Sequence, residues 1–157
     1  MIAAPIGRPL AGAALSLCLS AAAPVDAGIE VVADSGAVLA TFAAPEGAEW
    51  CLHWRHSVTG GAVADCFETR AGTLLLTRSF LHDYAAGLGE IAGRGTVRAA
   101  AGGGYWIDVI DEPLPGNTLR LRVGGARVAH RIAHPGGTLA LSARAAGQRV
   151  TLRPTPR

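Results

Sequence analysis

The sequence predicts an all-β protein, a small single-domain antiparallel β-sandwich or barrel-like fold of about 9–11 short strands. The main observation is that β-branched or leucine-rich segments recur at intervals of about ten residues after Gly28, with glycine-rich turn signals between them. Glycine and proline are frequent, at 21 and 9 residues, which suits many tight turns. Only His82–Ile91 offers room for a helical turn, and glycines 87 and 89 oppose a long helix there.

The strand segments follow one another along almost the whole chain. In order, they are Ile29–Ala33, Ala37–Phe42, Glu49–Val58, Val63–Arg70, Thr73–Phe80, Thr96–Ala100, Tyr105–Ile110, Thr118–Val123, Ala126–Ala133, Thr138–Ser142 and Gln148–Arg153. Glycine-rich stretches such as Gly87–Gly95 and Gly102–Gly104 lack the strand–loop–helix context and the lysine of a phosphate-binding loop. We therefore interpret them as turns and expect no cofactor.

The composition excludes several classes of function. All 14 basic residues are arginine, so a Walker A lysine and a Schiff-base lysine are impossible. Aromatic residues make up 5% of the chain, which is too few for a base-stacking platform, and we expect no nucleic-acid partner. Hydrophobic residues make up 50%, which excludes disorder caused by low hydrophobicity.

Residues 1–27 have the features of a secretory signal peptide. Arg8 supplies a positive start, Leu10–Ala23 is apolar or small throughout, and Val25–Ala27 offers small residues for cleavage. The apolar run has about 14 residues, whereas a membrane-spanning helix needs roughly 20. This predicts that residues 28–157 form a single β domain in the periplasm or outside the cell. The alternative is an uncleaved segment that anchors the protein in the membrane.

A hairpin is expected to carry a disulfide. Export removes Cys18 and leaves Cys51 and Cys66 as an even pair in an oxidising compartment. If these two cysteines lie opposite each other, Trp50 lies opposite Phe67 on the apolar face, so one register satisfies both pairs. The closed loop would stabilise the fold by about 3 kcal/mol on the chain-entropy model. The alternative is two unpaired buried thiols.

A second hairpin is expected around the glycine pair Gly124-Gly125. Before the pair, leucines alternate with Arg120 and Arg122, which is typical of a half-buried strand. The glycine pair suits a two-residue turn with positive φ at both positions. The return strand would then point His130 into the molecule and leave the two arginines on the outer face.

His56 and Asp65 are the most distinctive candidates for a site, because both fall on the predicted face of the tryptophans. A histidine held by a carboxylate could bind a ligand or act as a base, or the two could form a structural pair. Ser57 points to the opposite strand face from His56, and no G-x-S-x-G motif occurs, so a triad of Ser57, His130 and Asp65 is not the expectation. We expect no enzyme.

Metal ligation is not expected from the histidine spacing. His53 and His56 are three residues apart on a strand and face opposite ways. His130 and His134 share a face but stand about 13 Å apart along a strand, too far apart for one ion.

Charge is distributed unevenly along the chain. Residues 28–112 contain eleven acidic residues and five arginines, whereas residues 113–157 contain eight arginines and no acidic residue. One interpretation is a basic face for anionic lipid, an acidic partner or a carboxylate ligand. The other is that strands of the two halves interleave and neutralise each other.

Several motifs together resemble one family. Trp54-Arg55-His56-Ser57-Val58 followed by Val63-Ala64-Asp65-Cys66-Phe67 is similar to the W-x-H-S-V … V-x-E-x-[FY] opening of a bacterial domain of unknown function, DUF1850. Later pieces keep the family order, namely Thr77–Phe80, Tyr84–Leu88, Tyr105–Ile107, Leu119–Val123, His130 and Gly147–Val150. The resemblance spans Val38 to Leu152. Asp65 replaces the usual glutamate, and the Cys51/Cys66 pair is not a family hallmark.

The resemblance implies a small exported or membrane-tethered bacterial protein, since members are often encoded beside tripartite (TRAP) transporters with a TAXI-type solute receptor. We therefore expect a non-enzymatic periplasmic accessory protein whose partner is a TRAP transporter membrane subunit or solute receptor, with peripheral membrane contact as a further option. The alternative is a stand-alone secreted module that binds a small ligand or glycan.

The expected binding site is a cluster formed by His56, Ser57, Asp65, Arg78 and His130. In this hypothesis the two histidines are polar anchors at a pocket mouth, Asp65 fixes the tautomer of His56, and Arg78 pairs with a ligand carboxylate. Arg120 and Arg122 would form a partner or lipid surface.

Overall fold

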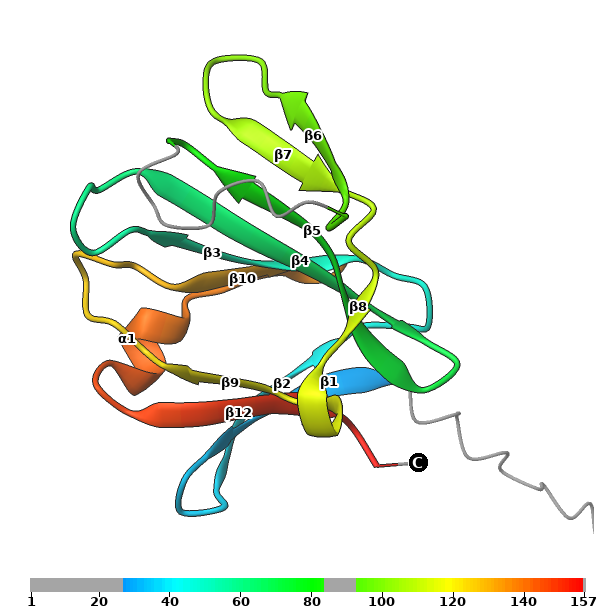
Figure 1. The fold of residues 1–157 in the computed structure, drawn as a ribbon. Coiled ribbons are helices and arrows are strands. Elements are labelled where there is room, and N and C mark those ends of the chain that lie inside the picture. The colour runs from blue at the N-terminus through cyan, green and yellow to red at the C-terminus, as the bar shows by residue number, and fades with distance from the viewer. Residues whose placement is uncertain (1–26, 84–92, 157) are drawn as a thin grey trace, which may run out of the picture.

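The computed structural model describes residues 27–83 and 93–156, which form two antiparallel sheets (Figure 1). The smaller sheet has four strands in the order β2-β1-β12-β9. Their bounds are Val38–Ala43 for β2, Gly28–Ala33 for β1, Arg149–Pro154 for β12 and Leu119–Arg122 for β9. The expected signal peptide and most of the expected helical turn at His82–Ile91 lie outside the described residues.

The larger sheet has eight strands, seven of them in the order β11-β10-β3-β4-β5-β7-β6, and β8 pairs with β5. Their bounds are Gly137–Leu139 for β11, Arg131–His134 for β10, Trp50–Arg55 for β3, Ala62–Arg70 for β4, Thr73–Leu81 for β5, Tyr105–Asp108 for β7, Thr96–Ala99 for β6 and Glu112–Pro113 for β8. Each sheet therefore combines strands that are distant in sequence.

The two sheets form the layers of a sandwich, and a short helix, α1 (Leu141–Ala145), lies at one side of it (Figure 1). The core between the layers takes buried side chains from the smaller sheet, the larger sheet and α1; among them are Ile29, Val31, Phe42, Val150, Leu152, Trp50, Leu52, Phe67, Leu74, Ile132, Leu141 and Ala145. The all-β prediction is confirmed, and of its two alternatives the sandwich is the observed one.

Strand β3 shows how the alternating pattern sets the two faces of the larger sheet. Trp50 and Leu52 are buried in the core, whereas Cys51 and His53 are half-buried on the outer face. Cys51 lies opposite Cys66 in the β3–β4 pairing, as the sequence predicts. A slip of one residue would turn the tryptophan out of the core, so the hydrophobic pattern fixes this register.

The predicted hairpin at Gly124-Gly125 is wrong. Strand β9 pairs with β12, and the chain then crosses to the larger sheet, where β10 begins at Arg131 and pairs with β3. Gly124 is required for a different reason from the one predicted: a Cβ at this position would lie 2.5 Å from the Cβ of Val128. A close approach within one connection and a two-residue hairpin turn both call for glycine, and the local sequence does not distinguish them.

Three other segments differ from the expected strands. Strand β3 ends at Arg55, and residues 56–59 form a turn instead of continuing to Val58. The segment Thr138–Ser142 divides between β11 and α1, because Leu141 and Ala145 are buried at the i, i+4 spacing of a helix. The short strand β8 was not expected. No described helix has the length and apolar character needed to cross a membrane.

Candidate functional site

His56 and Ser57 lie in the turn that follows β3. The Nδ1 atom of His56 accepts a hydrogen bond from the Thr59 backbone N–H at 3.2 Å, and the His56 carbonyl accepts one from the Gly60 N–H at 2.9 Å. Ser57 is exposed. Both residues are therefore held by local turn geometry and not by a strand.

Asp65 faces the inside of the sandwich from β4. Its Oδ1 atom accepts a hydrogen bond from the Ser79 hydroxyl at 2.6 Å. Burial raises the pKa of the Asp65 carboxyl, while the Ser79 bond and the charge of Arg94 act in the opposite direction. This carboxylate thus has a partner on the neighbouring strand β5.

The structure does not bring Asp65 to His56. In the β3–β4 register Asp65 lies opposite Leu52, and the backbone N–H of His56 bonds to the Gly61 carbonyl. Four residues of extended strand separate Gly61 from Asp65, which is about 13 Å. The expected contact fails because β3 stops one residue before His56, so the alternation of faces does not extend to it.

His130 belongs to a backbone network that joins the β9–β10 connection to α1. Its Nδ1 atom accepts a hydrogen bond from the Gly124 N–H at 2.9 Å, and its own N–H donates to the Ser142 hydroxyl at 2.8 Å. That hydroxyl donates to the Gly124 carbonyl at 2.6 Å. Burial lowers the pKa of His130, so the ring is neutral at pH 7 and carries its proton on Nε2.

One shallow cavity brings three of the five expected site residues together. Its volume is about 250 Å³, and its lining includes His56, Ser57 and His130 together with Trp54 and Arg122. The ring centroids of Trp54 and His130 lie 6.0 Å apart. The expected cluster is therefore divided: the two histidines share a cavity, whereas Asp65 and Arg78 are not among its lining residues.

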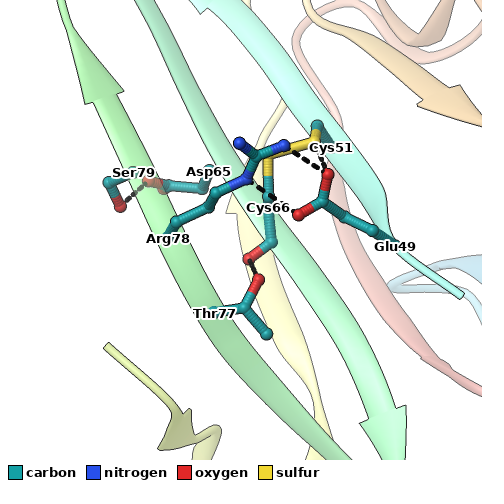
Figure 2. The surroundings of a disulfide bond; sticks show 7 residues. All are labelled: Glu49, Cys51, Asp65, Cys66, Thr77, Arg78 and Ser79. Atoms are coloured by element: carbon teal, nitrogen blue, oxygen red, sulfur yellow. Dashed lines mark hydrogen bonds and ion pairs between the residues drawn. A yellow bond between two sulfur atoms is a disulfide. The ribbon is translucent and has the colours of Figure 1, made fainter. Parts of the chain in front are cut away.

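Arg78 lies on the outer face of the larger sheet and already has an internal partner. Its Nε donates to a carboxylate oxygen of Glu49 at 2.8 Å, and a second guanidinium nitrogen donates to the other oxygen (Figure 2). The guanidinium also lies over the Trp106 ring, 4.4 Å from the centroid. The Arg78 guanidinium, which was expected to pair with a ligand carboxylate, is thus paired with Glu49.

The predicted disulfide between Cys51 and Cys66 is present beside this ion pair (Figure 2). Glu49, Cys51 and Cys66 place one ligand atom each within 4.8 Å of one another. Zinc and other soft metals bind the thiolate form of cysteine, which the disulfide removes. This cluster is therefore a covalent and ionic link between β3, β4 and β5.

The outer face of the smaller sheet carries an arginine surface, formed by Arg120, Arg122 and Arg149. All three side chains are exposed, and Arg122 lies directly opposite Arg149 in the β9–β12 pairing. Within the described residues, no carboxylate lies within ion-pair distance of any of them. A hollow of about 520 Å³ lies against this surface, and Asp34 is also among its lining residues.

A groove on the outer face of the larger sheet is not predicted from the sequence. It has a volume of about 610 Å³, and we call it the outer-face groove; its lining includes His53, Arg55, Ala62, Ala64, Phe80, Arg98, Trp106 and Arg131. These residues come from six strands that are dispersed between residues 50 and 134. Each side chain could be assigned to an outer face from alternation, but their proximity depends on the strand order.

The fold and these surfaces define an all-β sandwich whose outer faces carry arginines and shallow cavities. The chain belongs to the family described as a domain of unknown function (DUF1850), whose model matches residues 51–141. The match includes the cysteine hairpin and the segment that carries Arg120, Arg122 and His130. No curated protein and no solved structure matches the chain.

Proposed function

We propose that this protein is a non-enzymatic, exported accessory protein of a tripartite solute transporter and that it binds an acidic surface of a transporter membrane subunit or solute receptor through the arginine surface. The observation that carries this proposal is the cross-strand pair of Arg122 and Arg149, which are directly opposite and exposed. The transporter association comes from the family resemblance, and the charge of the arginine surface indicates how such a partner would be bound.

The electrostatics of the smaller sheet favour an external acidic partner. Like charges directly opposite each other on a sheet are destabilising, so the fold gains nothing from Arg122 facing Arg149. The same sheet shows the opposite arrangement four residues further along β12, where Arg153 bonds to Glu30 on β1 at 3.1 Å. Strand interleaving therefore neutralises one arginine and leaves the arginine surface available to a partner.

Two further observations support the non-enzymatic and exported parts of the proposal. The residues that a hydrolytic triad would need are separated, since the carboxyl of Asp65 bonds to Ser79 inside the sandwich while Ser57 lies in an exposed turn. The Cys51–Cys66 disulfide fits a protein that folds in an oxidising compartment.

In-cell cross-linking of the tagged full chain in its native host, followed by mass spectrometry, tests the proposal. We expect the wild type to capture a transporter membrane subunit or solute receptor, and R122E/R149E to lose that capture. The matched control is R55E/R131E, which makes the same charge change on the outer-face groove and should retain capture. Thermal unfolding of both variants checks that they fold. Unchanged capture by R122E/R149E, or capture of no transporter protein by the wild type, would overturn the proposal.

A further inference from the structure

Six strands of the larger sheet contribute one residue each to a single row across its outer face. The pairings that establish this row place Arg131 opposite His53, His53 opposite Ala64, Ala64 opposite Phe80, Phe80 opposite Trp106 and Trp106 opposite Arg98. Directly paired residues on neighbouring strands project from the same face of a sheet. The row therefore runs from one arginine to another across the outer-face groove.

The groove exists because small residues occupy the middle of this row. Ala64 is flanked by the larger side chains of His53 and Phe80, and Ala62, two residues away on β4, is exposed and lines the same hollow. Phe80 and Trp106 form an aromatic wall, with ring centroids 5.3 Å apart. Large side chains around an alanine floor leave a volume of about 610 Å³, which is in the range of small-molecule sites.

The end of the groove opposite the aromatic wall is positively charged. Arg131 on β10 and Arg55 on β3 are diagonal neighbours on the same face, about 7–8 Å apart at the backbone. Both are exposed, and neither has a carboxylate within ion-pair distance in the described part of the chain. By contrast, Arg98 at the other end bonds to Asp108 at 2.8 Å. One end of the groove thus lacks a counter-ion, and the other already has one.

We propose that the outer-face groove binds a small aryl carboxylate. The carboxylate accepts hydrogen bonds from Arg55 and Arg131, because the planar guanidinium matches a carboxylate in a bidentate manner. The aryl group packs against Phe80 and Trp106, whose faces and edges favour another flat ring. Between the arginines and the aromatic wall, the imidazole of His53 provides one polar ring beside the alanine floor.

The dimensions of the sheet limit the ligand to a few rings. The backbone positions of Arg131 and Phe80 are separated by three strand intervals, or about 14 Å. The arginine side chain reaches inward over part of this span, so an acid with two fused rings fills the rest. This site goes beyond the proposed partner surface, since it lies on the other sheet and uses other arginines.

Isothermal titration calorimetry of the full chain with 2-naphthoate at low salt tests the proposal. We expect 2-naphthoate to bind. We expect the affinity for 2-naphthamide, which has the same rings without the charge, to be lower by a factor of about ten or more. R131Q should weaken naphthoate binding by a similar factor. A62L should also abolish binding, because a leucine at this exposed position fills the floor of the groove while leaving the fold intact.

The matched control is R122Q, which removes an arginine from the arginine surface and should leave the affinity for naphthoate unchanged. Absence of naphthoate binding, equal binding of the amide, or an equal loss in R122Q would each overturn the inference. The two proposals fail separately, since capture of a transporter protein depends on Arg122 and naphthoate binding depends on Arg131. Thermal unfolding of R131Q and A62L confirms that any loss of binding occurs in a folded protein.

Discussion

Two groups of arginines, one on the outer face of each sheet, differ in their partners. On the larger sheet, Arg78 and Arg98 bond to the internal carboxylates of Glu49 and Asp108, and Arg78 also stacks on Trp106. On the smaller sheet, the arginine surface has no such partners among the described residues. The charge counted along the chain therefore does not show which arginines remain available to an external partner. That depends on whether a neighbouring strand places a carboxylate beside the arginine.

The two faces also differ in how they are held together. The larger sheet is linked by a disulfide between β3 and β4 and by the ion pair that joins β5 to Glu49, just before β3 (Figure 2). The smaller sheet depends on backbone pairing, on its buried inner face and on exposed ion pairs such as Arg153 with Glu30, which contribute little. A change that removes covalent support should therefore affect the larger sheet first.

The largest expected effect is that of removing the disulfide. C51S/C66S should lower the free energy of unfolding by about 3 kcal/mol, because the bond closes a loop with a sequence separation of 15 residues in the unfolded chain. Urea unfolding of the variant and of the wild type, with and without reductant, measures this difference.

The comparison of the two faces makes this prediction more specific. The reduced wild type should match C51S/C66S, and naphthoate binding in the outer-face groove should weaken more than capture through the arginine surface. Equal unfolding free energies of the oxidised wild type and the variant would show that the bond contributes nothing to stability.

A smaller effect concerns pH. Burial lowers the pKa of both His53 and His130, and the charge of Arg131 lowers that of His53 further. At these two histidines the unfolded chain therefore takes up protons below about pH 6.5 before the folded protein does, so their contribution to the free energy of unfolding falls as the pH decreases from that value. The decline should level off below the lowered pKa values. Urea unfolding between pH 8 and pH 5 measures it.

The charge of Arg131 lowers the pKa of His53 on the same sheet, whereas the charge of Arg122 on the other sheet should not affect it. R131Q should raise the pKa of His53 toward its ordinary value, whereas R122Q, on the other sheet, should leave it unchanged. A titration of the imidazole signals by NMR distinguishes the two variants. If R122Q shifted the His53 pKa as much as R131Q, the two faces would not be electrostatically separate.

Much of the fold follows from local sequence, and the cysteine hairpin is the clearest case. There, alternation, apolar pairing and the cysteines all specify one register, so the sequence alone is enough to pair Cys51 with Cys66. In the segment after β9, the local sequence signals do not specify one pairing. The alternation of this segment is equally compatible with a return strand, and the actual pairing of β9 with β12 closes a loop of 26 residues between Arg122 and Arg149 that no local signal encodes.

The candidate site could be predicted less well for the same reason. Asp65 was correctly placed inside the sandwich, but its partner Ser79 depends on the β4–β5 register, which has a bulge after Cys66. The outer-face groove depends on six strands being neighbours in one order, although residues such as Trp106 and Arg131 each alternate as expected. Contacts within a hairpin follow from the local sequence. A row of residues across a sheet depends on the strand order, which the local sequence does not determine.

The smallest expected effect is a gain in stability from the arginine surface itself. R149T should raise the free energy of unfolding by about 0.2–1 kcal/mol at low salt, because it removes the repulsion with Arg122 and introduces a β-branched residue that suits a strand. The matched control is R153T on the same strand and the same outer face, where the arginine bonds to Glu30, so this change should be neutral or slightly destabilising. Urea unfolding at low and at about 1 M salt measures both, and the gain in R149T should shrink at high salt because the Debye length falls to about 3 Å. A gain of equal size in both variants would indicate that threonine propensity alone is responsible, and the argument that the arginine surface is electrostatically uncompensated would then be wrong.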